Sequence, residues 1–167
     1  GMVTMNWLDR FPFDFQNAVI INSSSRDTAF PLRRLQPRGV RGFIKVALAK
    51  SNHEKEGEIL SFNCNTATFK DPQLHERWGR WADEKPNPIS NAIIQLQAGM
   101  RFKAPKTLPI RTLFVSSQGD RLTHPQCSWE LARRFKAPVI FHDIAGHDIP
   151  LDAPDWLADQ IQRWLHT

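Results

Sequence analysis

Cysteine is scarce in this sequence, which has two, Cys64 and Cys127, among 167 residues. Two cysteines provide neither a disulfide framework nor a paired metal-binding motif, and this scarcity is typical of proteins of the reducing cytoplasm. The sequence also has no apolar run long enough to cross a membrane, no secretory leader, no internal repeat and no glycine-rich phosphate-binding loop. We therefore expect a cytoplasmic protein without a membrane-spanning segment.

Basic residues outnumber acidic ones, 22 to 17, which gives a formal net charge of +5. Much of this excess lies within residues 26–55, where basic and apolar side chains are interspersed as in an amphipathic helix. Such a segment can bind nucleic acid or an anionic membrane surface, but more often it is a solvated face opposite a core stripe. We therefore expect neither as a partner, and a non-enzymatic basic binding module stays open as an alternative.

The last third of the chain predicts alternating strands and helices. Apolar runs at residues 110–115 and 137–142 are typical of buried strands, and residues 126–135 between them have helical spacing. A strand, a helix and a second strand in this order require a parallel sheet. Together with a further apolar run at residues 17–22, the sequence predicts an α/β fold with a small parallel sheet and helices on its faces.

An acid and a histidine follow the two strands of this last third. Asp120 lies on the turn after the first strand and His147 on the turn after the second. Because the carboxyl ends of parallel strands meet at one edge of a sheet, we expect both side chains at that edge. There an Asp can accept a hydrogen bond from an imidazole N–H and stabilise the imidazolium as the ring takes a proton from a nucleophile. The pair therefore predicts a catalytic acid and base, which still require a nucleophile.

The turns that carry Asp120 and His147, each with a glycine directly before the named residue, resemble the acid turn and the histidine loop of the α/β-hydrolases. The resemblance implies a truncated α/β-hydrolase fold with Asp120 as orienting acid and His147 as general base. It also implies three segments: a helix and strand after the nucleophile (residues 1–24), a helical lid (25–106) and a carboxyl-terminal unit (107–167). Serine esterases and related acyl hydrolases of this family act on ester or amide substrates, so neither a cofactor nor a metal ion is expected.

Four helices are expected within the lid, over residues 39–50, 54–66, 71–82 and 90–102, the last of them capped by Ser90. Apolar lid side chains could line an acyl pocket, although each is more often ordinary core. The candidates for that lining are Phe30, Phe43, Phe62, Trp78 and Met100.

The beginning of the sequence departs from the family. Gly1-Met2-Val3 would align with the end of the Gly-x-Ser-x-Gly nucleophile elbow, so the serine of that motif and the strands before it are absent. None of the remaining hydroxyls and thiols near the site lies in a glycine-flanked turn between a strand and a helix, and we interpret them as strand ends or small buried groups. These are Ser23, Ser24, Ser25, Ser116, Ser117, Cys64 and Cys127. We therefore expect a chain that retains acid and base but is not catalytic by itself. The alternative is a working hydrolase whose nucleophile is another residue or comes from a separate polypeptide.

The first predicted strand is expected to have a free edge, because the strand that flanks it in the family is missing. Unpaired backbone groups and apolar side chains at such an edge can pair with another chain. The sequence therefore predicts a homodimer or larger assembly formed around Val19, Ile20 and Ile21 and the helix expected over residues 2–11.

Overall fold

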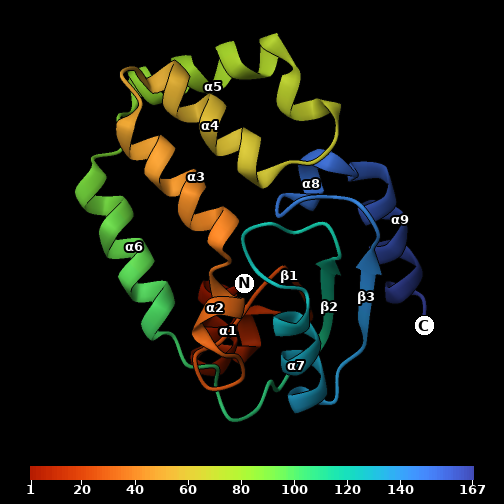
Figure 1. Ribbon diagram of the computed structural model, residues 1–167. Helices are drawn as coiled ribbons and strands as arrows, with labels where there is room; N and C mark the ends of the chain where they lie inside the picture. Colours follow the sequence, from red (N-terminus) through yellow and green to blue (C-terminus); the bar gives the residue numbers. More distant parts are fainter.

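The computed structural model describes the whole chain except for the side chains of residues 67 and 68. Its centre is a three-stranded parallel sheet in the order β1-β2-β3 (Figure 1). The strands are β1 (Asn17–Ile21), β2 (Arg111–Ser117) and β3 (Val139–His142). The prediction of a small parallel sheet is confirmed, and each strand begins or ends within two residues of its expected bounds.

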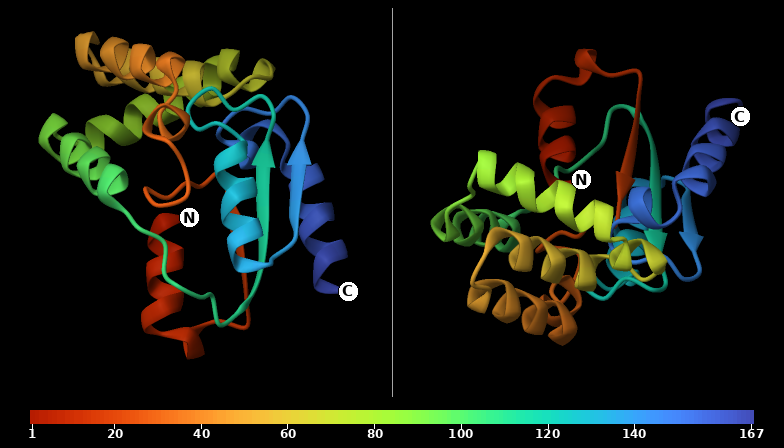
Figure 2. Two further views of the ribbon diagram at one scale, coloured as in Figure 1. Left: turned by 60° about the horizontal axis from the view of Figure 1, so that its bottom comes forward. Right: turned by 90° about the horizontal axis from the view of Figure 1, so that it is seen from above.

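Helices cover both faces of this sheet (Figure 2). One face packs against α1 (Met2–Arg10) and α7 (Gln126–Phe135) through a buried cluster that includes Met5, Phe114 and Leu131. The other face packs against α8 (Ile149–Asp152) and α9 (Pro154–Leu165). Successive residues of β2 point to opposite faces and both faces are covered, which explains why every residue of this strand after Arg111 is buried.

Helix α7 has the bounds that the sequence predicts, and only some of its apolar side chains are buried. Leu131 and Ala132 are buried, whereas Trp129 is 41% exposed. The Trp129 ring lies 5.1 Å from the guanidinium carbon of Arg133, in the arrangement of a surface cation–π pair. Trp129 is therefore a surface residue of α7, although its helical spacing would allow it to share an apolar face with Leu131 and Ala132.

The edge of β1 that faces away from β2 pairs with no strand in the described structure. The side chains along β1 are nevertheless covered in part, because Ile20 is fully buried in the same cluster as Met5 of α1. A partner chain would therefore meet mainly the unpaired backbone groups of β1 and the exposed side chains of α1, such as Trp7. Self-association through this edge stays a prediction.

Helices between β1 and β2 form a layer beyond the carboxyl ends of the strands (Figure 2). They are α2 (Pro31–Arg34), α3 (Pro37–Leu48), α4 (Asn52–Asn63), α5 (Pro72–Glu84) and α6 (Ile89–Arg101). Single 3₁₀ turns lie at η1 (Pro12–Asp14) and η2 (Ala67–Lys70). Helices α3, α4 and α5 pack against one another in sequence, whereas α6 has no buried residue. No helix in the described part of the chain is long and apolar enough to cross a membrane.

Helix ends in this layer differ in small ways from the sequence prediction. Asp71 caps α5, because its side chain accepts a hydrogen bond from the backbone N–H of Gln73. Ser90 does not cap α6: the helix begins one residue earlier, at Ile89, with Pro88 in the cap position. The short helix α2 lies before the four expected helices and was not predicted from the sequence.

Candidate functional site

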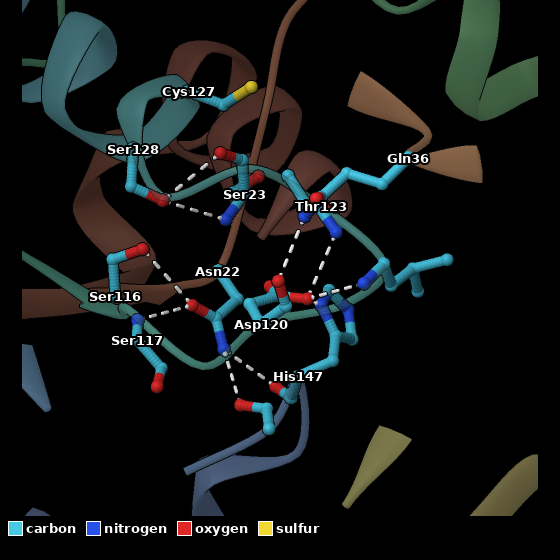
Figure 3. A network of polar contacts seen from close by, with 12 residues as sticks. Asn22, Ser23, Gln36, Ser116, Ser117, Asp120, Thr123, Cys127, Ser128 and His147 are labelled. Carbon is cyan, nitrogen blue, oxygen red and sulfur yellow. Dashed lines mark hydrogen bonds and ion pairs between the residues drawn. The ribbon is translucent and has the colours of Figure 1, made fainter. Parts of the chain in front are cut away.

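Asp120 and His147 lie together at the carboxyl edge of the sheet, where the turns after β2 and β3 meet (Figure 3). The Oδ2 atom of Asp120 is 2.8 Å from Nδ1 of His147. The Asp120 side chain is 1% exposed, whereas the His147 side chain is 29% exposed. The acid is thus shielded from water, while the imidazole is reachable from solvent. The two side chains lie at the same edge of the sheet, as their positions directly after parallel strands predict.

The carboxylate of Asp120 is held in a fixed orientation by its own turn. Its Oδ1 atom accepts hydrogen bonds from the backbone N–H groups of Leu122, at 2.7 Å, and Thr123, at 2.9 Å. Oδ2 is left for the imidazole. Because an ionised carboxylate only accepts hydrogen bonds, Nδ1 of His147 carries the proton in this contact. The other ring nitrogen, Nε2, then has a free lone pair and can act as a base.

Asn22 is a buried residue of the site that the sequence analysis did not identify. It follows β1 and has φ of 44°, a left-handed conformation that Asn tolerates better than most residues. Its Nδ2 atom donates to the backbone carbonyl of His147 at 2.7 Å, and its Oδ1 atom accepts from the backbone N–H of Ser117 at 3.0 Å and from Ser116 Oγ at 3.2 Å. Asn22 therefore ties the histidine loop to the ends of β1 and β2 (Figure 3).

Two side chains from the helical layer fix the same loops from the opposite side. Asn65, after α4, donates through Nδ2 to the backbone carbonyls of Gly119, at 2.6 Å, and Ile144, at 2.9 Å. Gln36, before α3, donates to the carbonyl of Asp120 at 2.8 Å. The acid turn is thus bonded to two segments of the layer above it. The separation of Asp120 and His147 depends on that layer as well as on the sheet.

Gly119 and Gly146, which directly precede Asp120 and His147, lie so close to neighbouring backbone that no side chain fits there. A Cβ atom at Gly119 would lie 2.5 Å from the carbonyl oxygen of Ile144, and one at Gly146 would lie 2.1 Å from that of Asn63. Real Cβ atoms essentially never approach so closely, and in both cases the neighbour is backbone. Glycine at these positions lets the acid turn and the histidine loop pack against their neighbours without a gap.

Asp152 connects the histidine loop to the segment after α4. Its Oδ2 atom accepts from the backbone N–H of Gly146 at 2.6 Å and from that of Asn65 at 2.7 Å, and its Oδ1 atom accepts from Thr66 Oγ1 at 2.6 Å. Burial alone would raise the pKa of Asp152, but these hydrogen bonds together lower it below its ordinary value. Asp152 is therefore a structural anchor for the loop that carries His147.

Replacing Asp152 should make the protein less stable in a way that depends on pH. A carboxyl whose pKa is lowered in the folded state stabilises that state above the unfolded pKa, and this stabilisation is lost as the pH falls through the folded pKa. We expect Asp152→Asn to lower the free energy of unfolding by about 1–2 kcal/mol at pH 7, with the difference shrinking below about pH 4. Urea denaturation of both proteins at several pH values between 7 and about 3 measures this difference in the free energy of unfolding. The control is Asp155→Asn, an exposed carboxyl in the first turn of α9, and a pH-independent difference for Asp152→Asn would contradict the assignment.

Most of the candidate nucleophiles are occupied or inert. Ser116 Oγ donates to Asn22, and Ser117 Oγ donates to the carbonyl of Ala145. Burial raises the pKa of the Cys64 and Cys127 thiols to about 12, so both are protonated near neutral pH and are poor nucleophiles.

The three serines after β1 differ in their contacts. Ser25 Oγ bonds to Asp27 and to the backbone N–H of Ala104. Ser24 Oγ accepts a long hydrogen bond, at 3.4 Å, from Arg34. Ser23 bonds to Ser128 through its backbone groups, and its own hydroxyl has no hydrogen bond to any described residue. Ser23 is therefore the hydroxyl that remains available.

A cavity of about 670 Å³ opens beside His147. It lies between the carboxyl edge of the sheet and helices α2, α3 and α6, and Asn22 and Ser23 are among its lining residues. Of the five apolar side chains considered as pocket lining, Phe43 and Met100 line it. Trp78 packs in a separate cluster around Leu60, and Phe62 packs against Phe43 with ring centroids 5.4 Å apart.

The comparisons with known proteins give structural relatives but no sequence relatives. No protein-family model matches the sequence, and no curated protein matches it significantly. A 2-hydroxy-6-oxo-6-phenylhexa-2,4-dienoate hydrolase from a Rhodococcus strain superimposes with a TM-score of 0.72 at 18% identity, over 99% of this chain and 60% of its own. A thermophilic esterase from Thermogutta terrifontis gives 0.65 at 17% identity, over 99% and 61%. An alpha/beta hydrolase enzyme from a deep-sea metagenome library gives 0.64 at 16% identity, over 99% and 62%.

These likenesses extend over nearly the whole of this chain, but the chain spans only about three fifths of the length of those proteins. At such low identity they establish a shared fold and do not carry over a substrate. The predicted fold is confirmed, whereas the catalytic roles of Asp120 and His147 stay predictions.

Proposed function

We propose, from the α/β-hydrolase fold of this chain, that Asp120 and His147 form the acid–base part of the site of an ester or related acyl hydrolase. The observation that carries the proposal is the 2.8 Å contact between Asp120 Oδ2 and His147 Nδ1. The acid is buried, the imidazole is reachable, and a cavity lies directly beside the ring. This is the arrangement that lets a histidine take a proton from a nucleophile.

The chemistry of the pair follows from its geometry. His147 would accept the proton of a nucleophilic hydroxyl through Nε2, since Nδ1 is held by Asp120. The resulting imidazolium would be stabilised by the carboxylate of Asp120, whose low exposure keeps water from weakening the interaction. The same Nε2–H would then protonate the departing alkoxide or amine.

We further propose that these 167 residues alone do not complete a hydrolytic site. Two of the candidate serines are bonded into the ends of the strands, and both thiols are buried with raised pKa values. In the α/β-hydrolases the nucleophilic serine lies in a glycine-flanked turn between a strand and a helix, which presents its hydroxyl to the base. No described serine of this chain lies in a turn flanked by glycines in that way. The acid and the base are thus expected to lack an activated nucleophile.

Intact-mass measurement after exposure to a fluorophosphonate tests the proposal, because this reagent reacts with activated nucleophiles. We expect no stoichiometric adduct on the unmodified chain and none on His147→Ala. The pair itself is tested on the same samples by the proton resonance of the hydrogen-bonded Nδ1–H of His147, which should be present in the unmodified chain and lost in Asp120→Asn. Absence of this signal from the unmodified chain would overturn the assignment of acid and base.

The alternative is a working hydrolase that uses a nucleophile from within the chain. The observation that favours it is the position of Ser23, which lines the same cavity as His147 and whose hydroxyl has no hydrogen-bond partner among the described residues. An adduct that disappears in both Ser23→Ala and His147→Ala would establish this alternative. An adduct that persists in His147→Ala would instead indicate chemistry outside the site.

A further inference from the structure

The lining of the cavity beside His147 contains positively charged side chains and no negatively charged one among the described residues. Three arginines contribute to it: Arg26 from the segment after β1, Arg34 from α2 and Arg101 from the end of α6. No aspartate or glutamate is among the described lining residues. A concave site lined by one sign of charge concentrates ligands of the opposite sign.

Arg34 is the most buried of the three arginines, and some of its N–H groups have no hydrogen-bond acceptor among the described residues. Its guanidinium donates to the backbone carbonyls of Gly99 and Met100, and more weakly to Ser24 Oγ. These contacts use three of its five N–H groups. They also place a positive charge at the carboxyl end of α6, where the helix dipole favours it. That role accounts for the position of Arg34, but it does not account for Arg26 and Arg101.

Nearby acids do not pair with these arginines. Asp27, the neighbour of Arg26 in sequence, is bound by Arg134 and by Ser25 Oγ. Neither Arg26 nor Arg101 forms an ion pair with any side chain that the structure describes. Burial lowers the pKa of the Arg34 guanidinium; the charge of Arg26 adds to this effect, and that of Asp27 opposes it. The wall of the cavity thus retains positive charge that no described carboxylate neutralises by direct contact.

The rest of the cavity wall is mainly apolar. Its apolar members include Met2, Leu35, Phe43, Leu96, Met100 and Leu122. Burial of an apolar group against such a surface is favourable in proportion to the area removed from water. A guanidinium is suited to hold a carboxylate through paired hydrogen bonds. The cavity wall therefore combines apolar side chains with positively charged ones.

From this arrangement we propose that the cavity beside His147 selects an acyl substrate with an apolar body and a second, anionic group, a carboxylate, which Arg26 and Arg101 bind. The identification of the ligand as a substrate rests on the proposed hydrolase function. The anion-binding site itself does not, because its residues are separate from Asp120 and His147. Binding can therefore be measured without turnover.

Calorimetric titration with phenylhexanoate and with its uncharged primary amide tests the site on the full chain. The two probes have the same apolar body and differ in charge. We expect the carboxylate to bind about tenfold more tightly than the amide at low ionic strength, the effect of about one charge-assisted hydrogen bond. The preference should shrink as salt is added. Equal affinities, or no binding of either probe, would overturn the proposal.

Substitutions locate the preference within the cavity. Arg26→Met and Arg101→Met should each reduce it severalfold, whereas Arg38→Met should preserve it, because Arg38 is an exposed residue of α3 outside the cavity. An equal loss in Arg38→Met would assign the effect to net charge and overturn the proposal. His147→Ala should keep the preference. If the carboxylate preference holds while the Nδ1–H signal of His147 is absent, the binding site stands and the hydrolase function fails.

Discussion

Gly146→Ala is expected to lower the free energy of unfolding by about 3 kcal/mol, the upper range for inserting a methyl group into a packed site. The added Cβ would lie 2.1 Å from the carbonyl oxygen of Asn63. That oxygen belongs to the backbone at the end of α4 and also accepts the N–H of Asp148 at 3.1 Å. It cannot move aside as the tip of a flexible side chain would, so the histidine loop must shift instead.

The shift should be visible at His147 as well as in stability. Guanidinium denaturation measures the change in free energy, and the Nδ1–H resonance of His147 reports whether the contact with Asp120 survives. The control is Gly99→Ala in α6, where the new Cβ would meet nothing closer than Met2 Sδ at 3.7 Å. Alanine in a helix is favoured over glycine, so this control should be neutral or slightly stabilising. If Gly146→Ala behaved like Gly99→Ala, the close approach would have no energetic importance.

Asn22→Ala is expected to cost a similar amount, about 3 kcal/mol, for a different reason. The substitution leaves the buried N–H of Ser117 and the carbonyl of His147 without their partner. Each buried polar group that loses its hydrogen bond destabilises the fold by about 1–3 kcal/mol. The histidine loop would also lose its bond to β1, so the His147 Nδ1–H signal should broaden or disappear along with the loss of stability.

Two companion variants separate the hydrogen bonds of Asn22 from its backbone conformation. Asn22→Gly removes the same side chain but adopts φ of 44° without strain. It should therefore be destabilised nearly as much as Asn22→Ala if the hydrogen bonds are the cause. Asn17→Ala, at the other end of β1, should have little effect, because no described side-chain hydrogen bond involves Asn17. If Asn22→Gly were as stable as the unmodified protein, the hydrogen bonds of the Asn22 side chain would contribute nothing. The cost of Asn22→Ala would then come from the left-handed backbone conformation alone.

The parts of the fold that could be predicted from the sequence are those with an apolar run or a periodic apolar pattern. The strand at residues 111–117 contains a compact apolar run, the helix at 126–135 has helical apolar spacing, and both have nearly the expected bounds. Their order required a parallel sheet, and a parallel sheet brings the turns after its strands together. The proximity of Asp120 and His147 was therefore predictable without knowledge of any contact distance.

The polar residues that hold those turns were not predictable in the same way. Asn22, Asn65 and Asp152 each bond to backbone groups far away in the sequence. An isolated Asn or Asp beside a strand or helix is most simply interpreted as a local cap or turn residue. Its long-range partner depends on how three layers pack, and no periodic pattern in the sequence encodes that. The start of α6 was missed for a related reason, since a serine that looks like a cap can lie within the first turn.

The link between Asn22 and His147 also bears on how the molecule is assembled in time. These residues are 125 positions apart, and β1 pairs with β2 only after the whole helical layer has been passed. Contacts between such distant segments carry a large loop-closure cost and form slowly. Helices α3, α4 and α5 are close in sequence and can associate early, whereas the alignment of His147 with Asp120 requires all three strands. Recovery of the His147 signal during refolding should therefore trail the recovery of helicity, which makes the acid–base pair a late marker of native structure.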